Sequence, residues 1–230
     1  LDDTVVNHEI LVLIGEQGLY KTTWFNFLLP PELRCYFYTK TNSDRLNKDD
    51  LFSLTEFALI CFEELDGMRP AELNQLKAMV TMPYVNERAA YGRNKERHPH
   101  IASFCGTGNN VQFLTDPTGN RRWLPFEVSQ IRDPHLHAIP YELVYSQAYA
   151  LWKSGFCHWF SQEEIRVLNT HNSRFEVPNL EEDLIRTHFR KPFEGETGIF
   201  VTAADILEQI SSCLRYPLSP NKIGRIMAGL

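Results

Sequence analysis

The stretch that decides the fold is Ile10–Thr23, which reads ILVLIGEQGLYKTT. Its first five residues form an unbroken apolar run, and such runs are typical of a strand covered on both faces, as in a parallel α/β sheet. Apolar residues at helical spacing follow, from Trp24 to Leu28, and Pro30 ends that pattern. A strand, a glycine-containing loop, Lys-Thr and a helix, in this order, predict a phosphate-binding loop.

The residues of this loop match the chemistry that a triphosphate requires. Several negative charges need backbone N–H groups at a helix N-terminus and one cation that reaches the phosphates. Gly15 and Gly18 let the backbone approach, Lys21 can bridge the β- and γ-phosphates, and the Thr22 hydroxyl can ligate Mg²⁺. With Thr23, these residues form the predicted binding set, and the predicted cofactors are ATP and Mg²⁺.

One position of the loop departs from the usual pattern. The common form is G-x-x-x-x-G-K-(S/T), and here Tyr20 stands where that form has the glycine before Lys21. The alternative interpretation is an ordinary strand–loop–helix junction whose lysine is incidental.

Polar side chains follow two further apolar runs. Glu63 and Glu64 come directly after residues 57–62 (FALICF), and Asn109 follows a strand predicted from residue 101. Carboxylates at the carboxyl end of a strand lie in the crevice where α/β proteins bind ligands. We expect Glu63 to hold Mg²⁺, Glu64 to activate water and Asn109 to position that water. The alternative for Glu63 and Glu64 is an acidic pair at a helix start with no catalytic role. The alternative for Asn109 is an ordinary turn residue.

Two groups of basic residues have candidate roles. Arg121 and Arg122 follow turn residues 116–120 and are candidate arginine fingers, or else a solvated pair. Residues 84–100 are polar and basic and predict a hairpin. A positive stretch with a stacking ring suits single-stranded nucleic acid, although a solvated hairpin is the equal alternative. The residues of this stretch are Arg88, Tyr91, Arg93, Lys95 and Arg97.

Composition sets the broad class. Of 230 residues, 43% are hydrophobic and 23% charged, which excludes a disordered or low-complexity chain. The formal net charge of −6 argues against a surface coated in positive charge. No apolar run approaches the roughly 18 residues of a membrane span. The acidic start predicts no signal peptide, and five scattered cysteines without C-x-x-C predict reduced thiols, so we expect a cytoplasmic protein.

Helical patterns dominate from about residue 130. Ser161 and Glu164 form a capping box, and Asn179 with Glu182 forms a looser one. After a linker near residue 195, two short helical patterns suggest a helix-turn-helix, which could be a truncated winged helix. We therefore expect an ATPase core over residues 1–128, a helical region over 129–195 and a partial helix-turn-helix over 196–230.

The order of the motifs is more specific than any single one. The chain reads GEQGLYKTTW, FALICFEELDGM, LKAMVTMPYVNERAAYGRNKERHPH, IASFCGTGNN and FLTDPTGNRRWLPFEV. Over residues 8–128 this resembles the virulence-associated protein E family, bacterial and prophage proteins related to superfamily 3 helicases and phage primase-helicases.

This resemblance implies a P-loop NTPase core of AAA+ type with a central parallel sheet. It also implies a homo-oligomeric ring, for which a hexamer is one expected size, that translocates on single- or double-stranded DNA. A primase-like domain often precedes such a core, which agrees with the missing initiator Met. By position, the resemblance makes Lys21 and Thr22 the Walker A pair, Glu63 and Glu64 the Walker B acids, Asn109 sensor 1, Arg121 or Arg122 the finger on a neighbour's ATP, and Lys77, Arg88 and Arg93 the DNA-facing cations.

The expected function is that of an ATP-hydrolysing, helicase-like domain of a prophage or mobile-element replication protein. Two alternatives stay open. One is a P-loop kinase that acts on a small molecule. The other is a degenerate, non-hydrolysing DNA-binding or assembly module, which Tyr20 favours together with Cys61, a position where many relatives carry an additional acid.

Overall fold

A computed structural model describes most of the chain and divides it into two compact units, Leu1–Val177 and Pro178–Leu230. No helix of the described part is both long and apolar enough to cross a bilayer. The described residues are 6–41, 48–88, 94–115, 120–193, 195–211 and 220–229.

Unit 1 is built on a five-stranded sheet in which every pairing is parallel, as predicted. The strand order is β2-β3-β6-β1-β7, so β1 lies between two strands that come much later in the chain. The strands are β1 (Ile10–Ile14), β2 (Phe37–Lys40), β3 (Leu59–Phe62), β6 (Ser103–Gly108) and β7 (Trp123–Glu127).

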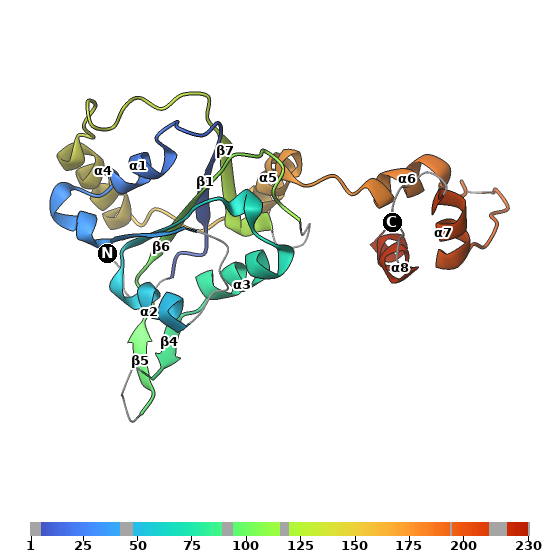
Figure 1. Ribbon diagram of the computed structural model, residues 1–230, viewed down its shortest axis with the longest axis horizontal. Coiled ribbons are helices and arrows are strands. Elements are labelled where there is room, and N and C mark those ends of the chain that lie inside the picture. Colours follow the sequence, from blue (N-terminus) through green and yellow to red (C-terminus); the bar gives the residue numbers. More distant parts are fainter. Residues whose placement is uncertain are drawn as a thin grey trace. The chain divides into compact units, whose positions relative to one another are not determined.

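Alternating side chains of β1 build a core on each face of the sheet. Ile10, Val12 and Ile14 pack in one cluster with residues of α2 (Lys48–Glu56) and α3 (Pro70–Val80). Leu13 packs on the other face with Phe25 of α1 (Lys21–Asn26). Figure 1 shows α1 on one side of the sheet and the other two helices on the opposite side. Double coverage explains why the β1 sequence is continuously apolar.

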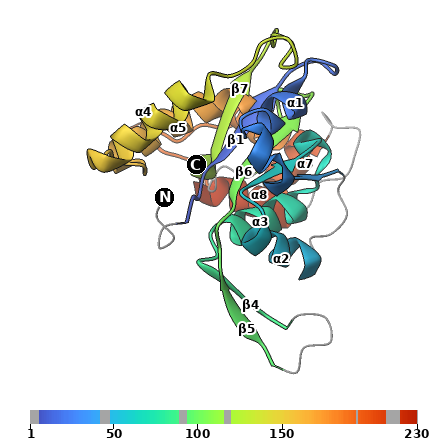
Figure 2. The same ribbon diagram turned by 90° about the vertical axis from the view of Figure 1, so that its left-hand side faces the viewer.

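A second, two-stranded sheet forms the predicted hairpin. Strands β4 (Tyr84–Glu87) and β5 (Glu96–Pro99) pair antiparallel, and Val85 of β4 reaches the core. The hairpin projects away from the main sheet (Figure 2).

The boundary expected after residue 128 does not separate two units, because later segments bind back to the sheet. α4 (Tyr141–Lys153) and α5 (Gln162–Asn172) both belong to unit 1, and α5 starts with the predicted Ser161 capping box. The buried Asn172 amide donates to the carbonyl oxygens of Asn120 and Trp123 at 2.8 and 3.0 Å. The short helices of this unit are η1 (Pro31–Tyr36), η2 (Leu65–Gly67), η3 (Asn120–Arg122) and η4 (Ser173–Phe175).

Unit 2 contains α6 (Leu180–His188), α7 (Ala203–Ser211) and α8 (Pro220–Gly229) around a small isoleucine core. The two predicted late helices are α7 and α8, while the turn between them lies outside the described residues. The boundary expected after residue 195 falls inside this unit, since α6 residues share that core. The Asn179 side chain makes no cap hydrogen bond, so the looser capping box was wrong.

Candidate functional site

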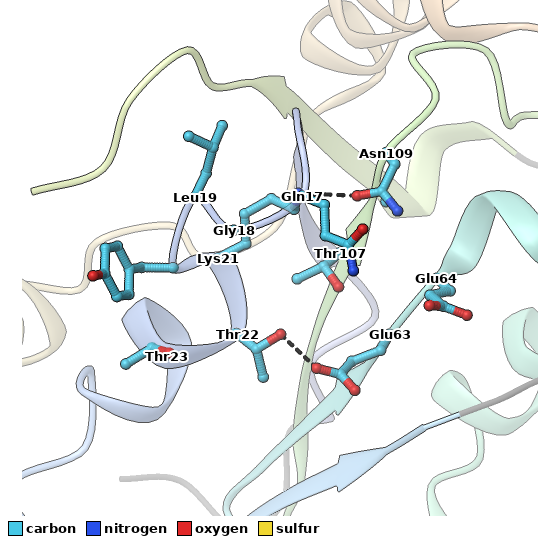
Figure 3. A pocket seen from close by; sticks show the side chains of 12 residues that line it. Gln17, Gly18, Leu19, Lys21, Thr22, Thr23, Glu63, Glu64, Thr107 and Asn109 are labelled. Atoms are coloured by element: carbon cyan, nitrogen blue, oxygen red, sulfur yellow. Dashed lines mark hydrogen bonds between the residues drawn. The ribbon is translucent and has the colours of Figure 1, made fainter. Parts of the chain in front are cut away.

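A cavity of about 320 Å³ opens where the carboxyl ends of β1, β3 and β6 meet (Figure 3). This edge is where parallel α/β sheets place their ligands. Nearly all predicted binding and acidic residues come together there. The lining residues are Gln17, Gly18, Leu19, Tyr20, Lys21, Thr22, Thr23, Glu63, Glu64, Thr107, Gly108 and Asn109.

The Lys21 ammonium lies at the centre of the β1–α1 loop. Its Nζ donates to the carbonyl oxygens of Gly15 and Glu16 at 2.6 and 2.7 Å, and to Oδ1 of Asn109 at 3.2 Å. Burial lowers the pKa of Lys21, and the nearby Asp66 carboxylate opposes that shift. The carbonyl groups of the loop therefore bind the ammonium group of Lys21 at the end of the same loop.

The backbone of the loop explains two of its residue types. A Cβ at Gly15 would overlap the carbonyl oxygen of Val128, so only glycine fits between β1 and the segment after β7. Gly18 has a φ of +88°, and Tyr20 a φ of +59°. Tyr20 thus adopts the left-handed conformation that glycine accepts freely, at a cost of about 1–2 kcal/mol for other residues. The position that usually carries glycine keeps its glycine-like backbone here.

Thr22 and Glu63 face each other across the cavity. The Thr22 hydroxyl donates to Oε1 of Glu63 at 2.7 Å, which joins the start of α1 to the end of β3. A hydroxyl and a carboxylate are hard oxygen donors of the kind Mg²⁺ takes, and that ion keeps several waters or phosphate oxygens besides. The donor set therefore fits Mg²⁺ with two protein ligands. No cluster of three or more His, Cys, Asp or Glu side chains forms a fuller metal site among the described residues.

Glu64 and Asn109 complete the predicted polar wall. Glu64 is exposed, lines the cavity next to Glu63 and has a φ of +55°. Non-glycine residues in this region are strained, and such strain gathers at functional sites. The Glu64 carboxylate is left accessible to solvent, whereas the Glu63 carboxylate is bound to Thr22 (Figure 3).

The sequence analysis did not name Gln17, Leu19, Thr107 and Gly108, which line the cavity, or Asp66, which supports one of its walls. Oδ1 of Asp66 accepts the backbone N–H of Asn109, and its Oδ2 accepts the backbone N–H of Asn110, both at 3.1 Å. The Asn110 side chain adds a third bond at 2.9 Å. The only sequence signal for Asp66 was a third acid two residues after Glu64, with no visible link to β6.

Arg121 and Arg122 lie at the opposite end of the sheet. They precede Trp123, which pairs with Ile10, whereas the cavity lies beyond Ile14. At ~3.3 Å per strand residue, Ile10 and Ile14 are about 13 Å apart along β1. Arg121 is exposed, and Arg122 is half-buried. Burial and the positive charge of Arg121 lower the pKa of Arg122. The buried Nε of Arg122 has no hydrogen-bond partner. The structure does not bring this pair to the cavity of the same chain.

The predicted DNA-binding residues divide into three groups. Arg88, Lys95 and Arg97 are exposed on or beside the hairpin, and the Arg97 guanidinium lies 3.8 Å from the centre of the Tyr84 ring. Lys77 is buried on α3, unlike these exposed cations. Tyr91 and Arg93 lie outside the described residues.

Comparisons with known proteins give one family and distant structures. The family model of the virulence-associated protein E-like domain matches residues 4–177. No curated protein matches the chain. Two apo structures of the NrS-1 C-terminal region match at 12% and 13% identity, with TM-scores of 0.41 and 0.43. The matches cover 74% and 73% of this chain, which spans only 34% and 35% of those structures.

Proposed function

The chain belongs to the virulence-associated protein E-like domain family, and we propose that it is an ATP-hydrolysing P-loop domain that moves on DNA during replication of a prophage or mobile element. The observation that carries this proposal is the pairing of Thr22 with Glu63 beside the buried ammonium of Lys21. A cation, a hydroxyl and a carboxylate at a helix start are the groups that a magnesium triphosphate needs.

The loop backbone and five side chains of the cavity have roles in this proposal. The backbone N–H groups of the loop and Lys21 bind the phosphates, while Thr22 and Glu63 hold Mg²⁺, which supplies positive charge to the phosphate oxygens when bound. Asn109 orients a water molecule. Glu64 accepts a proton from that water as its oxygen bonds to the γ-phosphorus and the bond to ADP breaks.

The exposed cations support a DNA partner. Arg88, Lys95 and Arg97 place positive charges on or beside a projecting hairpin that also carries Glu87 and Glu96, in a chain whose net charge is −6. Backbone phosphates are bound through such local patches. The proposed assembly is a homo-oligomeric ring, with a hexamer as one size, in a cytoplasmic protein whose full chain includes a primase-like domain.

A second candidate is a module that binds ATP and DNA without turnover. The strained left-handed Tyr20, an exposed residue that lines the cavity, favours it. It differs from the first candidate in hydrolysis alone.

Nucleotide binding and turnover, measured side by side, test the proposal. We expect a fluorescent ATP analogue to bind the native protein, and Lys21→Ala to abolish that binding. We expect phosphate release to rise when single-stranded DNA is added. Unchanged affinity in Lys21→Ala would exclude the phosphate-binding loop, whereas binding without any release, with or without DNA, would select the second candidate.

A further inference from the structure

A second cavity, of about 340 Å³, lies on the α1 face of unit 1. Trp24 of α1 forms one wall, and the segment that follows β7 forms the others. The apolar part of that segment consists of Ile131, Pro134 and Ile139, while Gln130, Arg132 and His137 add hydrogen-bonding groups.

The two cavities follow each other along α1, although no residue lines both. Lys21, Thr22 and Thr23 line the first cavity, and Trp24, the next residue of α1, lines the second. Consecutive Cα atoms are only about 3.8 Å apart. The segment after β7 starts beside the β1–α1 loop, because the Val128 N–H donates to the Ile14 carbonyl at 2.7 Å and the Val128 carbonyl oxygen packs on Gly15. A ligand held at Lys21 therefore has the second cavity within reach.

The chemistry of the second cavity differs from that of the first. The first is lined by charged and hydroxyl side chains, whereas the second offers an indole ring, aliphatic side chains and a few polar edges. None of its lining residues carries a carboxylate, and Arg132 adds a positive charge. Nucleobases are flat rings with hydrogen-bonding edges. Any of the bases can stack on an aromatic side chain, because each has a π-face. The Trp24 indole is itself held edge-on to Phe25, with ring centres 5.4 Å apart.

From this placement we infer that the second cavity receives the nucleobase of the nucleotide whose phosphates bind at Lys21, with the base stacked on Trp24. The inference rests on the proposed function, because it needs a nucleotide at the first site. It assigns base recognition to Trp24 of α1 together with the segment after β7, whereas the phosphates bind at the start of α1.

Two probes separate the base from the phosphates: ATP, and inorganic tripolyphosphate, which has no base. In calorimetric titrations with Mg²⁺ we expect Trp24→Ala to weaken ATP binding by roughly 10- to 100-fold, the loss of one stacked ring, and to leave tripolyphosphate binding unchanged. Trp24→Phe, which keeps a ring, should retain most of the ATP affinity. Trp159→Ala, which removes an exposed tryptophan outside both cavities, should match the native protein.

A second variant keeps the test decisive if Trp24→Ala fails to fold. Ile131→Trp fills the cavity from its other wall and should block ATP while sparing tripolyphosphate. Equal losses for both probes, or full ATP affinity in both variants, would overturn the base pocket. The Lys21→Ala variant distinguishes failure of the base pocket from failure of the proposed function. This variant should bind neither ATP nor tripolyphosphate. If it binds both as the native protein does, the assignment of the phosphate site is wrong.

Discussion

Asp66 holds Asn109 by its backbone, with Oδ1 of the carboxylate 3.1 Å from the Asn109 nitrogen. The other carboxylate oxygen holds Asn110 in the same way. This clamp ties the turn after β3 to the end of β6 and directs the Asn109 side chain to Lys21, 3.2 Å away. Asp66 is thus a positioning residue: it touches neither the phosphates nor the water in the proposed reaction.

Asp66→Asn should lower kcat by about 10- to 100-fold, because small displacements of a positioning group carry losses of that order. The Asn amide can replace only one of the two acceptor oxygens. Nucleotide affinity should change far less, since Lys21 and Thr22 remain. Steady-state kinetics would show the split between kcat and KM, with Glu142→Gln, an exposed acid of α4, as the control. A loss confined to KM would contradict the positioning role.

Substitutions of Glu63 and Glu64 should have different effects. Glu64→Gln should leave ATP bound and slow hydrolysis by about 10²–10⁴-fold, as expected when a general base is removed. Glu63→Gln should instead raise the Mg²⁺ concentration required for half-maximal activity, because Glu63 is the acid bonded to Thr22. Single-turnover assays across a magnesium titration distinguish the two effects. The reverse pattern would mean that the roles are exchanged.

Arg121 and Arg122 should act on a neighbouring molecule. The register of β1 and β7 puts them at the end of the sheet opposite their own cavity. Activity should then rise more steeply than linearly with protein concentration. A mixture of the Arg121→Ala, Arg122→Ala double variant with Lys21→Ala should recover some turnover, since each supplies what the other lacks. Constant specific activity on dilution, without complementation, would make the pair structural.

Nucleotide binding should weaken at alkaline pH earlier than an ordinary lysine predicts. Burial lowers the pKa of Lys21 from 10.5, so its ammonium loses its proton, and its attraction for phosphate, below that value. A bound anion favours the charged form, and affinity therefore falls as pH rises through the pKa of the free protein. Titrations from neutral pH to about 10 test this, with Lys21→Arg as the control that stays charged. A flat profile for the native protein would mean that the pKa of Lys21 is not lowered.

The site was predictable where it depends on local pattern and sheet direction. The apolar run of β1 and the Lys-Thr pair fixed the loop, and parallel strands had to bring Glu63 and Asn109 to the same edge. Asp66 was not predictable, because its role depends on η2 folding onto β6. Leu65 there occupies the space that a side chain at Gly106 would need.

A long-range contact explains why the boundary expected after residue 128 was misplaced, and the position of Lys77 on α3 explains its burial. Asn172 reaches back 49 residues to Trp123, and no local composition marks that bond. Lys77 shares a helix side with Leu73, Leu76 and Val80, and it is buried as they are. A charge in the sequence does not reveal how its methylene groups pack.

The three hydrogen bonds of Lys21 have a thermodynamic consequence. An ammonium has three donors and no acceptor, and here the two loop carbonyls and Asn109 take all three. A phosphate oxygen can enter only by displacing one of them. If the proposed nucleotide binds here, the protein carries an internal competitor for it, and the binding affinity is the difference between two sets of bonds to one nitrogen. Changes that loosen the Lys21–Asn109 bond would tighten binding without touching the ligand, which couples the strength of the proposed nucleotide binding to the rigidity of the loop's own hydrogen bonds.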